Sequence, residues 1–378
     1  MPDKPEKPPR RSDLDRLRVL ACLSTFAYHP LTVFDFGVFS HIKSHTTSAA
    51  IDVASRLLHV VRMPLFFLIA GMVGYLSIRR HSDRDILRQR AQRLLIPFLV
   101  GVILLAPCIK YFELLDGRNI NWRGAEALTG PPPEILVFLR RFFTQLRWFS
   151  WSHMWFLLYL FLLGAALLPL MRRLARTEWQ PSRSRPVALA PVGMLAVLLV
   201  NELALRPFFP AHVPNLIADW ASVATYVICM IGGAWLVRFP DIEIWLQRWW
   251  PLLGLAVAVG IGCYASADAG LRLGVGRALT LWGALGLVIG LGPTLSRHQL
   301  PGETYLAEAV LPLYVLHLLP LVVIAFYVKD LDWPVGLRYA TIAGGGFAVT
   351  LAIYHLLVRP FDLMRLALGL PARHPTAA

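Results

Sequence analysis

The stretch "DLDRLRVLACLSTFAYHP", residues 13–30, decides the fold, because it sets ionisable side chains at both ends of an apolar run. Arg18 lies near its charged beginning, and His29 follows eleven positions later. This spacing corresponds to about 16 Å along a helix and to nearly three turns, so both side chains project from one face. The stretch predicts a membrane-spanning helix in which His29 lies beyond the bilayer midplane.

The composition is that of a membrane protein. Of the 378 residues, 56% are hydrophobic and 16% are charged, and the mean hydropathy is +0.56. A soluble domain is nearer to about 25% charged. The net charge of +14 comes from Lys and Arg in short connections between apolar segments, a distribution that orients membrane proteins. Outside those segments the sequence has no basic helix of the kind that binds nucleic acid. We therefore expect the lipid bilayer as a partner and no nucleic acid.

Apolar segments long enough to span a bilayer recur along the chain, since about 20 apolar residues suffice. We therefore expect an all-α, polytopic integral membrane protein with about ten transmembrane helices. The candidate spans lie near residues 14–34, 58–78, 94–114, 153–171, 187–205, 218–238, 250–267, 277–296, 306–327 and 337–358.

Orientation and boundaries follow from charge and composition. Lys and Arg gather before the first span, after the second and after the fourth, so that side is predicted to be cytoplasmic, with both termini inside. Residues 1–12 are Pro-rich and charged and predict a disordered tail. The transmembrane domain is assigned to 13–366 and a C-terminal tail to 367–378. Apolar residues at helical spacing within 131–151 predict an interfacial helix on the outer side.

Ionisable residues inside the spans are the candidates for chemistry, because they are costly in hydrocarbon. A neutral imidazole can take a proton from an attacking hydroxyl near neutral pH, so His29 is a candidate catalytic base. One alternative is that His29 only hydrogen-bonds to a neighbouring helix. Glu308, which lipid-facing packing does not require, is a second candidate catalytic residue. His317 in the same span is a candidate substrate-binding residue, and so is His153, which begins another span.

Arginines near the cytoplasmic ends of the helices suit a phosphate-bearing ligand, because guanidinium pairs well with phosphate. Arg18 is one candidate. Arg90 and Arg93, in "RAQR", are three residues apart and share a helix face, although simple positive-inside anchoring would also explain them. His41 and His45 are too few for a metal site, and the four cysteines lack metal-ligand spacing, so we expect no metal.

These residues stand in motifs that resemble acyltransferase family 3, the integral-membrane acyltransferases. "LDRLRVLACLSTFAYH" looks like the family's first helix, in which an Arg, ten residues and a His correspond to Arg18 and His29. "MPLFFLIAG" resembles its second helix, with Ala70 where Ser is common. "RAQRLLIPF" is similar to its paired-arginine motif through Arg90 and Arg93.

Three further motifs, "HMWFLLYL", "EAVLPLYVLH" and "LVRPFDLMRLALGL", look like one branch of that family, the glucan biosynthesis protein C-like proteins. The resemblance implies an enzyme of a bacterial inner membrane. It would transfer an acyl group from cytoplasmic acyl-CoA, a co-substrate rather than a cofactor, to a glycan or glycolipid at the outer face. The branch implies succinyl transfer to periplasmic glucans, and acetyl transfer is the other short-chain candidate. For His29 the resemblance allows a second alternative, in which this residue carries the acyl group transiently instead of acting as the base.

Two other classes of function remain open from the sequence. A transporter or flippase of an envelope glycan or lipid-linked substrate would use the same buried charges as a pathway. No internal repeat supports it. A structural subunit of an envelope-glycan system is the second alternative, and it would tolerate the loss of His29.

Overall fold

The computed structural model describes residues 12–176, 186–210, 213–266, 270–295 and 302–373, and these residues are almost entirely helical. One short antiparallel hairpin, β1 (Arg118–Asn121) and β2 (Gly124–Ala127), interrupts the helices. The α-helices are α1 Ser12–Phe34, α2 Ala49–Ile78, α3 Asp83–Arg90, α4 Ile96–Val100, α5 Ala106–Leu115, α6 Ile135–Thr144, α7 Trp155–Ala166, α8 Leu168–Arg176, α9 Pro186–Val200, α10 Trp220–Arg238, α11 Asp241–Arg248, α12 Trp250–Ala265, α13 Gly270–Leu295, α14 Glu303–Leu316, α15 Leu318–Val328, α16 Val335–Ile353 and α17 Asp362–Ala367.

Short turns of other helix types join or extend several of these helices. A 3₁₀ turn precedes α7, and π-helical turns follow α3, α4, α9 and α16, so that α3, α4 and α5 form one continuous helix. A π-helical turn bonds residue i to residue i+5 instead of i+4, and such turns occur mostly singly within α-helices. The turns lie at Ser152–Met154, Ala91–Leu95, Gly101–Leu105, Asn201–Leu205 and Tyr354–Val358.

The predicted all-α membrane fold is confirmed. Among the described residues, six helices are long and apolar enough to cross a membrane, and three bent helix pairs raise the number to as many as nine. The shorter apolar helix Leu189–Leu205 falls on the one predicted span that these do not include. The number of spans is therefore close to the expected ten.

Two of the predicted spans are bent rather than straight, and a third bend lies just before the predicted span 250–267. The breaks lie between α7 and α8 (46°), between α11 and α12 (68°) and between α14 and α15 (57°). A proline follows each break within three residues, at Pro169, Pro251 and Pro320. Proline cannot donate to the helical ladder and clashes with the carbonyl four residues earlier, which accounts for a bend at each place.

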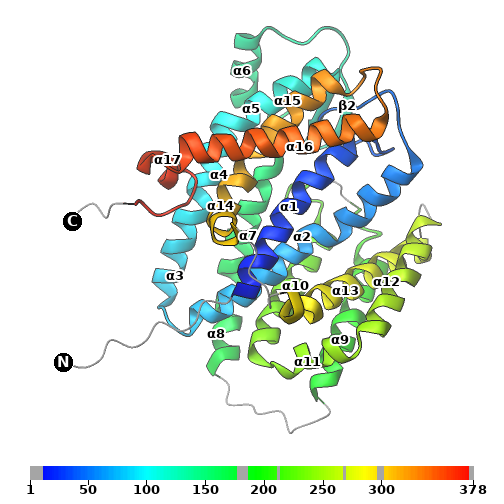
Figure 1. Ribbon diagram of the computed structural model, residues 1–378, viewed down its shortest axis with the longest axis vertical. Coiled ribbons are helices and arrows are strands. Elements are labelled where there is room, and N and C mark those ends of the chain that lie inside the picture. Colours follow the sequence, from blue (N-terminus) through cyan, green and yellow to red (C-terminus); the bar gives the residue numbers. More distant parts are fainter. Residues whose placement is uncertain (1–11, 177–185, 211–212, 267–269, 296–301, 374–378) are drawn as a thin grey trace.

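The helices α1 and α2 form the centre of the molecule, running side by side in Figure 1. α14 and α16 pack on α1, whereas α10 and α13 pack on α2, and α12 packs on α13. A buried bidentate ion pair between Arg16 and Glu303 joins α1 to α14, with nitrogen–oxygen distances of 2.5 and 3.2 Å. This pair fixes α14 against the beginning of α1.

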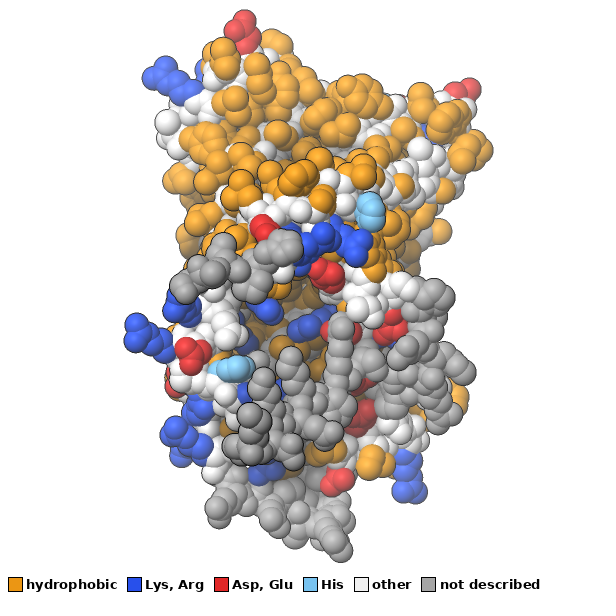
Figure 2. All heavy atoms as spheres, turned by 60° about the vertical axis from the view of Figure 1, so that its left-hand side comes forward, with side chains coloured by type: hydrophobic (Ala, Val, Ile, Leu, Met, Phe, Trp, Pro, Cys, Tyr) orange, Lys and Arg blue, Asp and Glu red, His pale blue; other side chains and the backbone are white. Residues whose placement is uncertain are grey.

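The surface separates into an apolar belt and a charged region. On the face in Figure 2, hydrophobic side chains cover the upper part, and charged side chains gather in the middle and lower parts. The interfacial helix predicted within 131–151 forms as the shorter α6. α6 buries Phe138 and Phe142 against α5 and leaves Leu136 and Phe143 exposed, which is an amphipathic arrangement.

The two predicted tails lie partly outside the residues that the structure describes. Of residues 1–12, only Ser12 is described, and α1 begins there. Residues 374–378 also lie outside the described part. Leu368 and Leu370, which the predicted boundary assigns to the C-terminal tail, are buried in the main core.

Glycines allow α2 and α10 to approach each other closely. A Cβ atom added at Gly233 would lie 2.0 Å from the carbonyl oxygen of Leu68, and one added at Gly71 would lie 2.0 Å from that of Met230. Small residues at such crossings let helix backbones pack in a membrane, where the hydrophobic effect contributes little to helix association.

We expect Gly233→Val to lower the thermal stability of the detergent-solubilised protein, because overpacking typically costs about 1–3 kcal/mol. Gly262→Val in α12 is the matched control, since no atom lies within 4 Å of a Cβ added there. The measurement is the midpoint of thermal aggregation by size-exclusion chromatography. Equal midpoints for the two variants would contradict the close α2–α10 crossing.

Candidate active site

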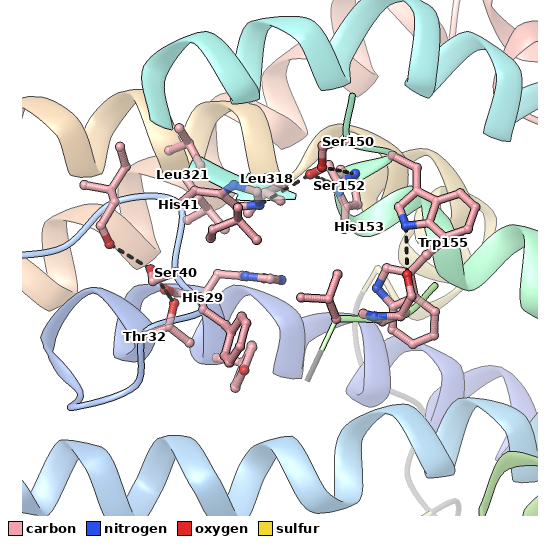
Figure 3. A pocket seen from close by; sticks show the side chains of 18 of the residues that line it. His29, Thr32, Ser40, His41, Ser150, Ser152, His153, Trp155, Leu318 and Leu321 are labelled. Carbon is pink, nitrogen blue, oxygen red and sulfur yellow. Dashed lines mark hydrogen bonds between the residues drawn. The ribbon is translucent and has the colours of Figure 1, made fainter. Parts of the chain in front are cut away.

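His29 opens into a cavity of about 470 Å³ between α1, α2, the beginning of α7 and the α14–α15 bend. Residues of the connection after α1, of β1 and of the connection before α7 complete its walls. We call it the His29 cavity. Figure 3 shows His29, His41 and His153 extending into this space from different parts of the chain.

Arg62 of α2 holds His29. Its Nη1 lies 3.3 Å from Nε2 of His29, and its guanidinium stacks on Tyr28, 3.9 Å from the ring centroid. Arginine has donors only, so Nε2 of His29 is the acceptor and a neutral His29 carries its proton on Nδ1. The Nε atom of Arg62 is buried and has no hydrogen-bond partner among the described residues, so this guanidinium has an N–H group to spare.

The bend between α14 and α15 adds two further imidazoles. The rings of His29 and His317 lie 5.1 Å apart, and those of His317 and His153 lie 4.8 Å apart. Nδ1 of His317 donates to the carbonyl of Tyr314 at 2.5 Å, and Nε2 of His153 donates to the carbonyl of Val315 at 3.0 Å. Carbonyls in the last turn of a helix need such outside donors.

These bonds determine where the histidine lone pairs point. Since the two carbonyls only accept, neutral His317 keeps its lone pair on Nε2 and neutral His153 keeps its lone pair on Nδ1. Nε2 of His317 is buried and has no hydrogen-bond partner among the described residues. The predicted site residues His29, His153 and His317 therefore form one cluster of imidazoles.

A second cavity, of about 610 Å³, lies toward the other end of α1. We call it the Arg93 cavity. Arg18, Arg93 and Glu308 line it, so the structure brings these three predicted residues together but separates them from His29. Nη1 of Arg18 lies 3.6 Å from the Asp15 carboxylate, and Glu308 forms an ion pair with Arg365 of α17 at 2.9 Å.

Arg90 lies beside this cavity rather than in its wall. A Cβ atom added at Gly164 of α7 would lie 1.8 Å from Nη1 of Arg90, and one added at Gly74 of α2 would lie 2.6 Å from Nη2. The guanidinium thus occupies a slot that only glycine leaves open. No acidic side chain in the described part of the chain forms an ion pair with Arg90.

An aromatic wall separates the two cavities. Tyr314 lines both of them, and its ring packs against Phe66 and Phe156, with centroids 6.2 and 5.2 Å away. Its hydroxyl donates to the backbone carbonyl of His153 at 2.6 Å. The same residue therefore supports the histidine cluster and closes the path from the Arg93 cavity.

A network of ion pairs and hydrogen bonds fixes the connection after α1. Nζ of Lys43 donates to the carboxylate of Asp35 and to the carbonyl of Thr32, at 2.7 Å from the latter. The hydroxyl of Ser55 donates to Asp35 at 2.6 Å. Burial lowers the pKa of Lys43, and its ion pair with Asp35 opposes that shift. These bonds hold His41 over the His29 cavity.

Several residues of the His29 cavity carried no functional prediction. The sequence raises His41 only as a candidate metal ligand, and nothing in it distinguishes Ser152. Glu113 and Lys110 form a buried ion pair in α5. Two charged residues in the apolar segment "APCIKYFELL" indicate a functional site by the same argument that applies to His29. Among the described residues, no group of three or more His, Cys, Asp or Glu side chains could hold a metal ion.

Comparison with known proteins agrees with this geometry. The sequence profile described as "Acyltransferase domain" matches residues 11–357. The chain belongs to this family, acyltransferase family 3. The curated relatives include the "Glucans biosynthesis protein C" of Salmonella heidelberg (strain SL476), which is 24% identical over 330 residues. That of Salmonella paratyphi B (strain ATCC BAA-1250 / SPB7) is 23% identical over 330 residues. Each alignment covers 82% of this chain and 82% of the relative.

The acyltransferase is a multi-pass membrane protein that transfers groups other than aminoacyl groups. Family membership favours an enzyme over the transporter and the structural subunit that the sequence left open. The predicted family and the predicted class of reaction are confirmed.

Proposed function

We propose that the acyltransferase moves a short acyl group, succinyl or acetyl, from cytoplasmic acyl-CoA to a hydroxyl of an envelope glycan on the other side of the inner membrane. The observation that carries this proposal is the pair of cavities at opposite ends of α1, which meet at Tyr314. A charged donor and a polar acceptor could approach from opposite sides, and only the thioester end of the donor would have to reach past the aromatic wall.

The Arg93 cavity suits the donor. Arg18 and Arg93 supply guanidinium groups to its wall, and charge-assisted hydrogen bonds to phosphate are among the strongest in proteins. Arg90 lies beside it with no ion-pair partner among the described residues, so it has donors for a third contact. Because positive charge predicts the cytoplasmic side, this cavity would open inward and both termini would be cytoplasmic.

The His29 cavity suits a sugar acceptor. Trp122, Trp151 and Trp155 contribute broad aromatic surfaces, and Asn121 and Asn215 contribute amides, a mixture that matches the apolar faces and hydroxyl edges of a sugar ring. The name of these relatives, "Glucans biosynthesis protein C", refers to glucans. This name and the cavity's lining together support a glucan as the acceptor.

In this mechanism His29 removes the proton from the acceptor hydroxyl. The incoming hydroxyl takes the place of Arg62 at Nε2 of His29, and the freed guanidinium stays close enough to donate to the oxyanion that forms on the acyl carbonyl. Glu308 keeps α17 against the donor cavity through Arg365. His153 and His317 position the reacting groups around His29.

Replacement of His29 tests the catalytic role. We expect His29→Ala to lower acyl transfer by at least about 100-fold, the scale of a lost general base. His29→Gln should be equally inactive, because glutamine can accept the hydrogen bond from Arg62 but cannot take up a proton near neutral pH.

The assay measures transfer from labelled succinyl-CoA or acetyl-CoA to glucan in membranes that hold equal amounts of each variant. Turnover near the wild-type rate in His29→Gln would refute the catalytic role and leave His29 as a structural contact of Arg62.

Removal of the donor contacts is the second test. We expect Arg18→Ala and Arg93→Ala each to weaken acyl-CoA binding by about 10-fold or more, because each deletes a charge-assisted contact. Gly164→Ala should weaken it as well, since the added methyl group displaces the Arg90 guanidinium while keeping its charge.

The control is Arg248→Ala, which removes an exposed positive charge from the end of α11, on the same predicted side but outside the Arg93 cavity. The measurement is the dissociation constant of acyl-CoA in detergent. If all four variants bind acyl-CoA as the wild type does, the arginines serve only as positive-inside anchors.

A further inference from the structure

Ser152 lies between two imidazoles in the His29 cavity. Its Oγ is 3.5 Å from Nε2 of His41 and 3.4 Å from Nδ1 of His153, and Figure 3 shows the hydroxyl between the two rings. These distances are at the long end of hydrogen bonding. Catalytic hydrogen bonds of this kind are often long in a protein without substrate and shorten when substrate binds.

The outer partners of both rings turn their lone pairs toward Ser152. Nδ1 of His41 lies 2.5 Å from the Glu113 carboxylate, which only accepts, so the proton of a neutral His41 is on Nδ1 and the lone pair is on Nε2. Nε2 of His153 donates to the carbonyl of Val315, which leaves its lone pair on Nδ1. Each imidazole can therefore accept the hydroxyl proton, whereas the lone pair of His29 is occupied by Arg62.

Burial and hydrogen bonds fix the position of the Glu113 carboxylate, as the third member of a catalytic triad requires. Its side chain is 0% exposed, and its Oε1 accepts from Nζ of Lys110 and from the backbone N–H of Ile120 at 2.6 Å. Its Oε2 is left for His41. Ser152 thus contacts His41, and His41 contacts Glu113, in the order nucleophile, base and orienting acid. A catalytic triad is recognised by this geometry and not by the positions of its members in the sequence.

The backbone at Ser152 has the form expected of an exposed nucleophile. Its φ angle is +50°, in the left-handed region that side chains other than glycine's rarely adopt. The residue begins the helical segment Ser152–Ala166, whose amino end carries partial positive charge. As in a nucleophile elbow, the serine lies on a strained turn at the beginning of a helix, although here the turn follows the connection after α6 rather than a strand. Strain of this kind gathers at functional sites.

We propose that Ser152 is a nucleophile that carries the acyl group as an ester between donor and acceptor, with His41 as its base and Glu113 as the residue that positions His41. The inference rests on the proposed function for its donor and acceptor. It adds a covalent intermediate in the His29 cavity.

In the first step, Oγ of Ser152 bonds to the thioester carbonyl carbon, its proton moves to His41, and the carbon–sulfur bond breaks to release the thiolate of coenzyme A. In the second step, the acceptor oxygen bonds to the ester carbonyl carbon while His29 takes the acceptor's proton. The bond to Oγ breaks, and Ser152 recovers its proton from His41. The proton left on His29 passes to water, and together the steps yield the acylated acceptor and coenzyme A.

The first test uses a fluorophosphonate probe, which reacts with activated serines and needs neither acyl-CoA nor glucan. We expect the purified full-length protein to form an adduct that peptide mass spectrometry assigns to Ser152. Ser152→Gly should abolish it while easing the positive φ. His41→Gln and Glu113→Gln should slow labelling, by at least about 100-fold for the base. Ser266→Ala, which changes an exposed serine at the end of α12 outside the His29 cavity, is the control and should still be labelled at Ser152.

The second test uses labelled succinyl-CoA and acetyl-CoA without acceptor. We expect an acyl ester on Ser152 that added glucan discharges in the wild type but not in His29→Gln, because only the second step uses His29.

The serine step and the proposed function fail separately. No adduct at Ser152, or glucan acylation by Ser152→Gly at the wild-type rate, overturns the serine step and leaves direct transfer with His29 as base. A fluorophosphonate adduct at Ser152 in a protein that takes no acyl group from either acyl-CoA supports an activated serine and overturns the proposed donors.

Discussion

The bend between α14 and α15 is the constraint on which the active site depends. In a straight helix, the carbonyls of Tyr314 and Val315 would accept from backbone N–H groups one turn later. Pro320 lacks the N–H that would bond to the carbonyl of Leu316 and clashes with that carbonyl, which accounts for the 57° bend. At this bend the imidazoles of His317 and His153 donate to the carbonyls of Tyr314 and Val315. Because unpaired polar groups are costly in a membrane, these bonds fix both rings and the directions of their lone pairs. The α14–α15 bend thereby orients the histidine cluster around His29.

The same bend divides the interior into two compartments. Tyr314, in the last turn of α14, packs against Phe66 and Phe156 and hydrogen-bonds to the His153 backbone, so it forms the wall between the cavities. Arg18, Arg93 and Glu308 line the Arg93 cavity, whereas Arg62 lines the His29 cavity together with neutral donors, acceptors and tryptophans. This division fits a reaction in which phosphates stay on one side of a membrane and only a small acyl group crosses.

Much of the fold and part of the candidate site could be predicted from the sequence. Long apolar segments identify spans because hydrocarbon thickness sets their length, and buried histidines are conspicuous within them. Spacing along α1 correctly placed Arg18 and His29 on one helix, but it could not show that an aromatic wall from other helices separates their cavities. Glu308 was conspicuous for the same reason as His29, yet its ion-pair partner, Arg365, lies in a helix far along the chain.

The triad of Ser152, His41 and Glu113 could not be predicted in this way. Its members come from a connection, the end of a span and the turn before α7, and no periodicity relates them. Tertiary packing alone brings them together, through the Lys43–Asp35 network and the buried Lys110–Glu113 pair. The bends at Pro169, Pro251 and Pro320 were similarly invisible, since prolines within spans are often accommodated without a break.

Acyl transfer across a sealed membrane is the most direct measurement of the central claim. Right-side-out vesicles would be loaded with labelled succinyl-CoA or acetyl-CoA, with a glucan oligosaccharide outside. We expect labelled glucan outside these vesicles, and none when both acyl-CoA and glucan are outside. Equal labelling when donor and acceptor share the outer side would contradict two cavities that open to opposite faces of the membrane.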